Sequence, residues 1–92
     1  MFIGYQKVLA DSTVKTATSL TIPTGSVGVS IMAADNDIRY TMDATTTPTT
    51  DDGMILMKGE SPITVMVNDL RRIKFTQGIP SNNAYLLLHY FN

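Results

Sequence analysis

The chain has 92 residues, of which 43% are hydrophobic and 16% are charged, and its formal net charge is −1. This length allows one domain, and the absence of cysteine excludes disulfides and thiolate metal sites. A chain so close to neutral lacks the basic surface that nucleic-acid binding requires, so nucleic acid is not expected as a partner.

Apolar and polar residues alternate along most of the chain, which is the period of half-buried strands. The predicted strands, in chain order, are residues 2–9, 19–22, 26–34, 37–42, 63–68, 70–76 and 84–91, with an eighth after Gly53. Turn-forming residues separate them at short spacing, and the segment ADND (34–37) is short enough for a tight hairpin. We therefore predict one domain over residues 1–92 with an all-β fold, either an antiparallel β-sandwich or a small jelly-roll-like barrel of about seven or eight strands.

The last predicted strand, AYLLLHYF (84–91), is apolar on both faces. Such a strand either lies centrally between two layers or is pressed against a neighbouring subunit. The N-terminus is also unusually hydrophobic, and a domain of this size gains stability from oligomerisation. We therefore predict a homo-oligomer, a dimer or trimer, with these residues at its interfaces: Phe2, Ile3, Tyr5, Tyr85, His89, Tyr90 and Phe91.

Arg71, Arg72 and Lys74 form the only basic cluster. Strand alternation places Arg72 and Lys74 on one face and Arg71 on the other. Two interpretations stay open. The face is either solvated, or Arg72 and Lys74 are interface residues that contact an acidic rim on a partner.

The threonine-rich stretch IRYTMDATTTPTTDDGMIL (38–56) is the best place to look for a ligand site. It lacks the EF-hand pattern, and adjacent aspartates in extended chain point to opposite sides, so we expect no metal or other cofactor there. Asp51, Asp52 and Gly53 are expected to form a turn with the glycine at positive φ. Arg39 and Asp43 are predicted to form an ion pair that braces the base of the loop.

Catalytic signatures are missing from the sequence. The single histidine, His89, lies in the most apolar strand, and no serine has a nucleophile-elbow context. No phosphate-binding glycine motif is present. The sequence therefore predicts a protein that is not an enzyme.

Several short segments resemble small virion proteins of tailed bacteriophages, of the capsid decoration or cement type. The segments are GYQKVLADST, SLTIPTGS, IRYTMDATTTPTTDDGMIL and LRRIKFTQG, followed by an aromatic-rich final strand, and the resemblance spans nearly the whole chain. The matching positions are Leu20, Thr21, Pro23, Arg39, Tyr40, Asp43, Pro48, Thr49, Gly53, Ile73, Phe75, Tyr90 and Phe91. The residues MDATTT depart from the compact turn that this pattern has after Arg-Tyr.

The resemblance implies a structural protein that oligomerises and binds the outer surface of a capsid, with the major capsid protein as its partner. It also implies a place on the virion surface after synthesis in the host cytoplasm. The sequence shows no signal peptide or apolar run of membrane-spanning length, so no membrane partner is expected.

Two alternatives remain at this point. The first is a tail or fibre module that binds host carbohydrate through Tyr40, Asp43 and Asp51. The second is a connector or tail-tube component that assembles into rings.

Overall fold

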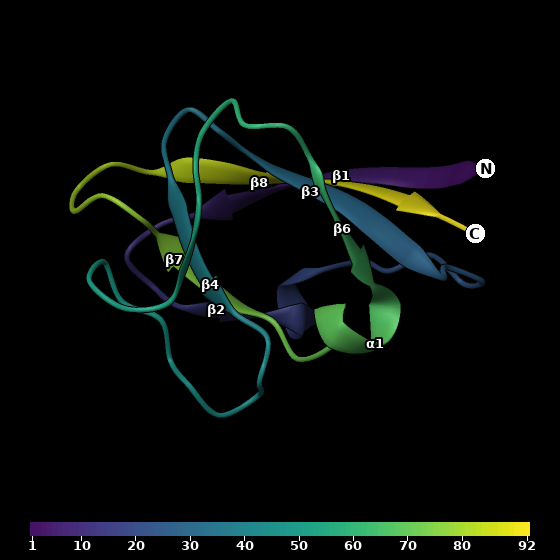
Figure 1. Cartoon of the computed structure of the whole chain (residues 1–92), viewed down its shortest axis with the longest axis horizontal. Helices are drawn as coiled ribbons and strands as arrows, with labels where there is room; N and C mark the ends of the chain where they lie inside the picture. The colour runs from purple at the N-terminus through teal and green to yellow at the C-terminus, as the bar shows by residue number, and fades with distance from the viewer.

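The computed structural model describes residues 1–92 and contains eight strands in two four-stranded antiparallel sheets (Figure 1). Sheet A has the order β1-β8-β3-β6, and sheet B has the order β2-β7-β4-β5. The strands of sheet A are β1 (Phe2–Ala10), β8 (Ala84–Phe91), β3 (Gly28–Ala34) and β6 (Ile63–Met66). The strands of sheet B are β2 (Lys15–Thr16), β7 (Lys74–Gln77), β4 (Ile38–Thr41) and β5 (Met54–Leu56). The predicted all-β fold of antiparallel strands is confirmed.

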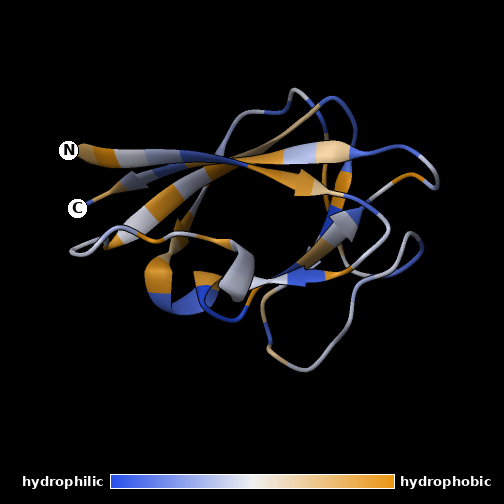
Figure 2. Cartoon of the chain, turned by 180° about the vertical axis from the view of Figure 1, so that it is seen from behind, coloured by the Kyte–Doolittle hydropathy of each residue, from blue (hydrophilic) through white to orange (hydrophobic).

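The core lies between the two sheets and follows from the alternation of side chains along each strand. Leu86, Leu88 and Tyr90 of β8 point into it and are at most 1% exposed. Ile38 of β4 and Phe75 of β7 are equally buried in sheet B, and all five belong to one apolar cluster. Each such side chain contributes about 1.5–3 kcal/mol through burial. Figure 2 shows the hydrophobic residues along the strands and the hydrophilic ones mainly in the connections.

The segment between β3 and β4 is a corner between the two sheets, because β3 belongs to sheet A and β4 to sheet B. The tight hairpin predicted there is wrong. Asp35 has a φ of 72°, and the Gly78 N–H donates to the Asp37 carbonyl at 2.8 Å. A Cβ on Gly78 would lie 2.8 Å from the Asp37 carbonyl carbon, so the two connections fit together only with glycine there.

Two other segments also differ from their predicted strands. Residues 19–22 form no strand, because the Thr21 N–H donates to the side chain of Gln6 at 2.9 Å instead of to a neighbouring strand. The second difference is α1 (Val67–Leu70), a single turn of helix between β6 and β7. It buries Val67 and Leu70, a spacing of three that suits one face of a helix and not of a strand.

The remaining regular element is a 3₁₀ helix, η1 (Ala17–Ser19). None of the helices is long and apolar enough to span a membrane. The two ends of the chain lie side by side at one end of sheet A (Figure 1), where the Asn92 N–H donates to the Met1 carbonyl at 3.0 Å.

Candidate functional site

The outward side of sheet A is an apolar surface, which we call the open face. Its residues are set by strand register, in which Tyr5 of β1 pairs with His89 of β8, and His89 with Ser30 of β3. The members that alternate with the core residues are Phe2, Tyr5, Lys7, Leu9, Gly28, Ser30, Met32, Ala34, Thr64, Met66, Tyr85, Leu87, His89 and Phe91. No strand or helix covers them, and Phe2 and Tyr5 are 55% and 63% exposed. Aromatic and aliphatic side chains on this side of sheet A are thus in contact with water, and an exposed apolar patch of this kind often marks an interaction site.

Four rings form a cluster at one end of the open face. The Phe2 ring stacks on the His89 imidazole with centroids 3.8 Å apart, and Tyr5 meets the same imidazole edge-on at 6.3 Å. Phe91 meets Phe2 edge-on at 6.2 Å. Aromatic pairs of this geometry contribute about 0.5–1.5 kcal/mol each beyond their buried area. The cluster is therefore ordered before any partner binds.

Gly28 is part of the same surface because the ring of Phe91 lies over it. A Cβ at this position would lie 2.4 Å from a ring carbon of Phe91. Any larger residue would lift the ring, so the glycine keeps this end of the open face flat.

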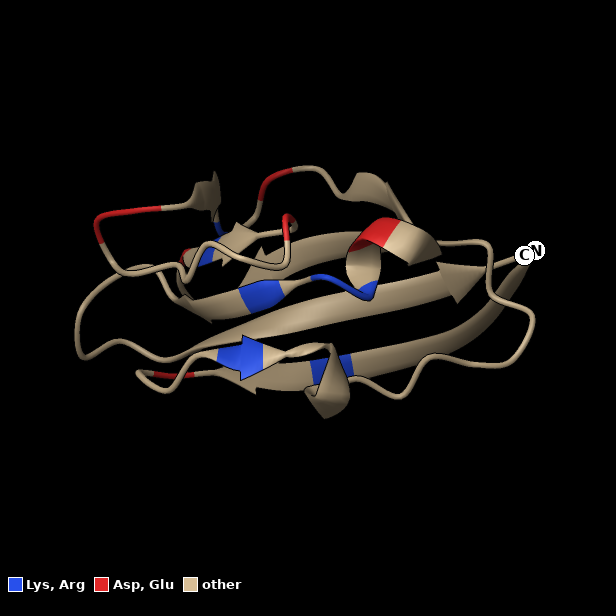
Figure 3. Cartoon of the chain, turned by 90° about the horizontal axis from the view of Figure 1, so that it is seen from below, with Lys and Arg blue, Asp and Glu red and all other residues tan.

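The open face is almost free of charge. Its only charged residue is Lys7, whose ammonium lies 4.3 Å from the centre of the Tyr85 ring. Every acidic residue lies in a connection or in α1 (Figure 3). Charge therefore neither solvates this face nor attracts a strongly charged partner to it.

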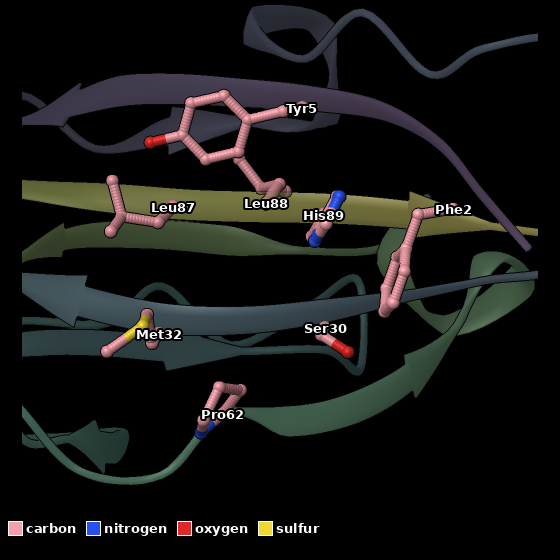
Figure 4. Close-up of a pocket in the computed structure, with 8 residues that line it drawn as sticks. All are labelled: Phe2, Tyr5, Ser30, Met32, Pro62, Leu87, Leu88 and His89. Carbon is pink, nitrogen blue, oxygen red and sulfur yellow. The ribbon is translucent and has the colours of Figure 1, made fainter.

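A hollow of about 240 Å³ lies in the middle of the open face (Figure 4). Its lining residues are Phe2, Tyr5, Ser30, Met32, Pro62, Leu87, Leu88 and His89. Ser30 and His89 are cross-strand neighbours, but no carboxylate lies on the face to orient the imidazole as a base. Five of the eight lining residues are hydrophobic, so the hollow suits an apolar or aromatic side chain.

The structure brings most of the predicted interface residues together. Phe2, Tyr5, Tyr85, His89 and Phe91 all lie on the open face. That they contact another subunit stays a prediction.

Four predicted interface residues lie elsewhere. Ile3 is half-buried against the core, and Arg72 and Lys74 are on the sheet B side, away from the aromatic cluster. The prediction for Tyr90 is wrong, because it is 1% exposed in the core and its hydroxyl lies 3.1 Å from Oε1 of Gln6. Both faces of this strand are apolar, so alternation alone does not tell which one is inside.

Sequence reasoning missed the β3 and β6 part of the open face. Met32 and Met66 belong to it, and Pro62 forms one wall of the hollow. The outward set of β3, Gly28 to Ala34, is small or apolar where a solvated strand would carry charge. That pattern was the signal available in the sequence.

The threonine-rich connection, residues 42–53, packs back on sheet B. Pro48 is fully buried and lines a hollow together with Thr76 and Gln77 of β7. The Thr41 hydroxyl donates to the Thr46 carbonyl at 2.6 Å, which closes the base of the loop. The predicted turn is confirmed, since Gly53 has a φ of 112°. Pro48 thus anchors the loop on sheet B, while Thr41, Asp43, Thr46 and Asp52 line an open hollow of about 450 Å³ beside it.

Arg39 and Asp43 each hold this loop, but through different partners. Arg39 donates to the Gly53 carbonyl at 2.7 Å, whereas Asp43 accepts from the Thr46 hydroxyl at 2.6 Å and from the Thr46 and Thr45 N–H groups at 2.8 and 3.1 Å. These hydrogen bonds, the Thr46 hydroxyl first, lower the pKa of Asp43 from 3.8 to about 2. The ion pair predicted between them is wrong, because the Gly53 carbonyl engages Arg39 while Thr45 and Thr46 engage Asp43.

The same geometry bears on the two ligand interpretations of the loop. No group of three histidine or acidic side chains is placed to hold a metal ion. Tyr40 packs against the core, and this burial raises its pKa. Asp43 is engaged by the Thr46 hydroxyl, and carbohydrate binding through Tyr40, Asp43 and Asp51 stays a prediction.

No protein family model, curated protein sequence or solved structure matches the chain.

Proposed function

We propose that the chain is a non-enzymatic structural protein of the bacteriophage capsid-decoration type, which associates with itself and binds the outer surface of a capsid shell. The open face is the observation that carries this proposal. It is an ordered, almost uncharged surface of aromatic and aliphatic side chains, left uncovered on a small domain. Burying apolar surface yields about 25 cal/mol per Å², so an assembly that covers this face is favoured over a free monomer. That the partner is a capsid is inferred from the sequence resemblance to decoration proteins.

The basic cluster supports a second contact surface, suited to the shell. The strand predicted for residues 70–76 begins only at Lys74, so alternation does not separate the three cations: Arg71 and Arg72 are exposed in the turn after α1, and Lys74 is half-buried at the start of β7. The only ion pair within the chain joins Lys15 and Asp11, so no carboxylate of the chain neutralises these three cations. We propose that they meet an acidic rim on the shell. Each contact is weak because it is exposed, but shell contacts repeat and sum through multivalency.

Binding to shells that lack the protein tests this function. Purified protein is mixed with such shells at increasing ratios, and the bound fraction is measured by co-sedimentation. We expect saturation at a fixed ratio to the major capsid protein. An Arg72→Glu and Lys74→Glu double variant should bind more weakly, and the loss should depend on salt concentration.

The matched control is Lys58→Glu, which reverses an exposed charge outside the basic cluster. It should bind like the unmodified chain. A chain that stays monomeric and ignores the shells at every ratio would contradict the proposed function.

A further inference from the structure

We infer that the open face is occupied by a second copy of the same chain, packed face to face about a two-fold axis. This inference rests on the proposed function and names the partner of one of its surfaces. The axis would run parallel to the strands, between the two faces, above the boundary of β8 and β3. It places β1 of each copy over the β3 and β6 side of the other.

Pairing through the sheet edges is a poorer route to an oligomer in this fold. The edge strand β5 has three residues and β6 has four, with Pro62 directly before β6. Along β1, the Lys15 ammonium donates to the Leu9 carbonyl at 2.7 Å, and the Gln6 side chain bonds the Ser19 carbonyl and the Thr21 N–H, so residues 15–21 lie beside that edge. Short or covered edges resist strand-to-strand association. The face is left as the route for self-association.

The charge of the open face favours a second copy over a charged partner. Lys7 is its only charge, and that ammonium is already engaged by the Tyr85 ring of its own copy. Two such faces bring together no acidic group and only two cations, both on the peripheral strand β1. A strongly acidic or basic partner would lose hydration here and find almost nothing to pair with.

The shape of the face is self-complementary. Phe2 and Tyr5 of β1 protrude on one side, and the hollow lies beside them, with Met32 and Pro62 as its far wall (Figure 4). The two-fold rotation directs Tyr5 of each copy toward the Met32 and Pro62 wall of the other. The same contact then forms twice, as it must in an isologous interface.

The area of the face suits a weak dimer. Its four strands have nine, eight, seven and four residues, and at about 4.8 Å between strands and about 3.4 Å per residue they give a footprint of roughly 450 Å² per copy. The two copies together bury about 900 Å², just below the roughly 1,000 Å² of a typical biological interface. The dimer is therefore expected to dissociate on dilution.

Sedimentation equilibrium, which gives the molar mass at each chain concentration, tests whether the partner is a second copy of the chain. The unmodified chain should approach twice its mass of 10.1 kDa as concentration rises. Tyr5→Glu places an unpaired charge in the interface and should raise the dissociation constant on the order of a hundredfold. The matched control is Met54→Glu on sheet B, because Met54 is also 63% exposed; it should dimerise normally.

If circular dichroism shows that Tyr5→Glu is misfolded, a second pair of variants tests the same surface. Met66→Glu lies on the open face at 49% exposed, and Met57→Glu lies outside it at 51% exposed. Only the first should weaken the dimer. Equal dimerisation of these two variants would overturn the assignment of the face.

Cross-linking tests the two-fold arrangement. Because the chain has no native cysteine, only the introduced cysteine can react. Ala34→Cys lies near the end of the proposed axis, and Thr47→Cys is exposed in the loop over sheet B. Packed sheets lie about 10 Å apart, too far for a disulfide but within reach of a short bismaleimide. Ala34→Cys should cross-link to a dimer and Thr47→Cys should not. The opposite pattern, or a trimer, would overturn the two-fold arrangement.

The outcomes separate this inference from the proposed function. If the chain stays monomeric but Tyr5→Glu loses binding to the shell, the open face meets the shell directly and the inference fails alone. If the chain dimerises through the open face yet never binds shells, the inference stands and the proposed function fails.

Discussion

Replacing Pro48 by alanine tests whether the threonine-rich connection is a packed cover or a free linker. The ring of Pro48 is fully buried over sheet B. The substitution removes two buried ring carbons at about 0.8 kcal/mol each, and the unfolded chain gains freedom that costs a further 0.4–1 kcal/mol or so. We therefore expect the free energy of unfolding to fall by about 2–3 kcal/mol. In a domain of this size that lowers Tm by roughly 10–20 °C.

Urea denaturation at one fixed chain concentration measures this effect, so that any dimer contributes equally to each variant. The matched control is Pro80→Ala, since Pro80 is exposed in the turn before β8. The free energy of unfolding of this variant should fall only by the contribution of the unfolded chain's greater freedom, about 0.4–1 kcal/mol. Losses that agree within about half a kcal/mol would refute the packed loop.

Three further predictions concern single contacts. Asp43 has a pKa of about 2 in the folded chain against 3.8 when free, so its contribution to stability is present above about pH 4 and is lost as pH falls toward 2. The Tm of Asp43→Asn should therefore lie below that of the unmodified chain at pH 5, and the gap should close near pH 2; a gap that stays constant would count against this account. Gly28→Ala should displace Phe91 and weaken self-association, with Tm nearly unchanged because only a flexible ring moves; normal sedimentation of this variant would contradict it. Gln6→Ala leaves the buried Tyr90 hydroxyl without its acceptor and should cost about 1–3 kcal/mol in urea denaturation, part of which Tyr90→Phe should restore.

Much of the fold could be predicted because the alternation of inward and outward side chains along a strand appears as an alternation of residue types in the sequence. In β3, the alternation separates Val29 and Ile31, which are buried, from Ser30 and Met32, which face outward. The same rule divided β8 correctly into two sets. It could not say which set faces the core, because both are apolar, and Tyr90 was therefore misplaced.

Two other failures share a physical cause, which is that the backbone partner of a residue cannot be read from a sequence. The corner after β3 depends on the Gly78 N–H and the Asp37 carbonyl, which come from distant parts of the chain. Arg39 likewise bonds a carbonyl, that of Gly53, and not the carboxylate that charge pairing suggested. The open face also needs the strand order, because β1, β8, β3 and β6 become neighbours only once the sheet is assembled.

The number of copies per particle tests the central claim most directly, and quantitative mass spectrometry of purified virions can count them against the major capsid protein. A decoration protein should be present at a fixed, high ratio that follows the symmetry of the shell. A count near a dozen would place the chain in a tail or connector, and its absence from particles would remove the capsid role altogether.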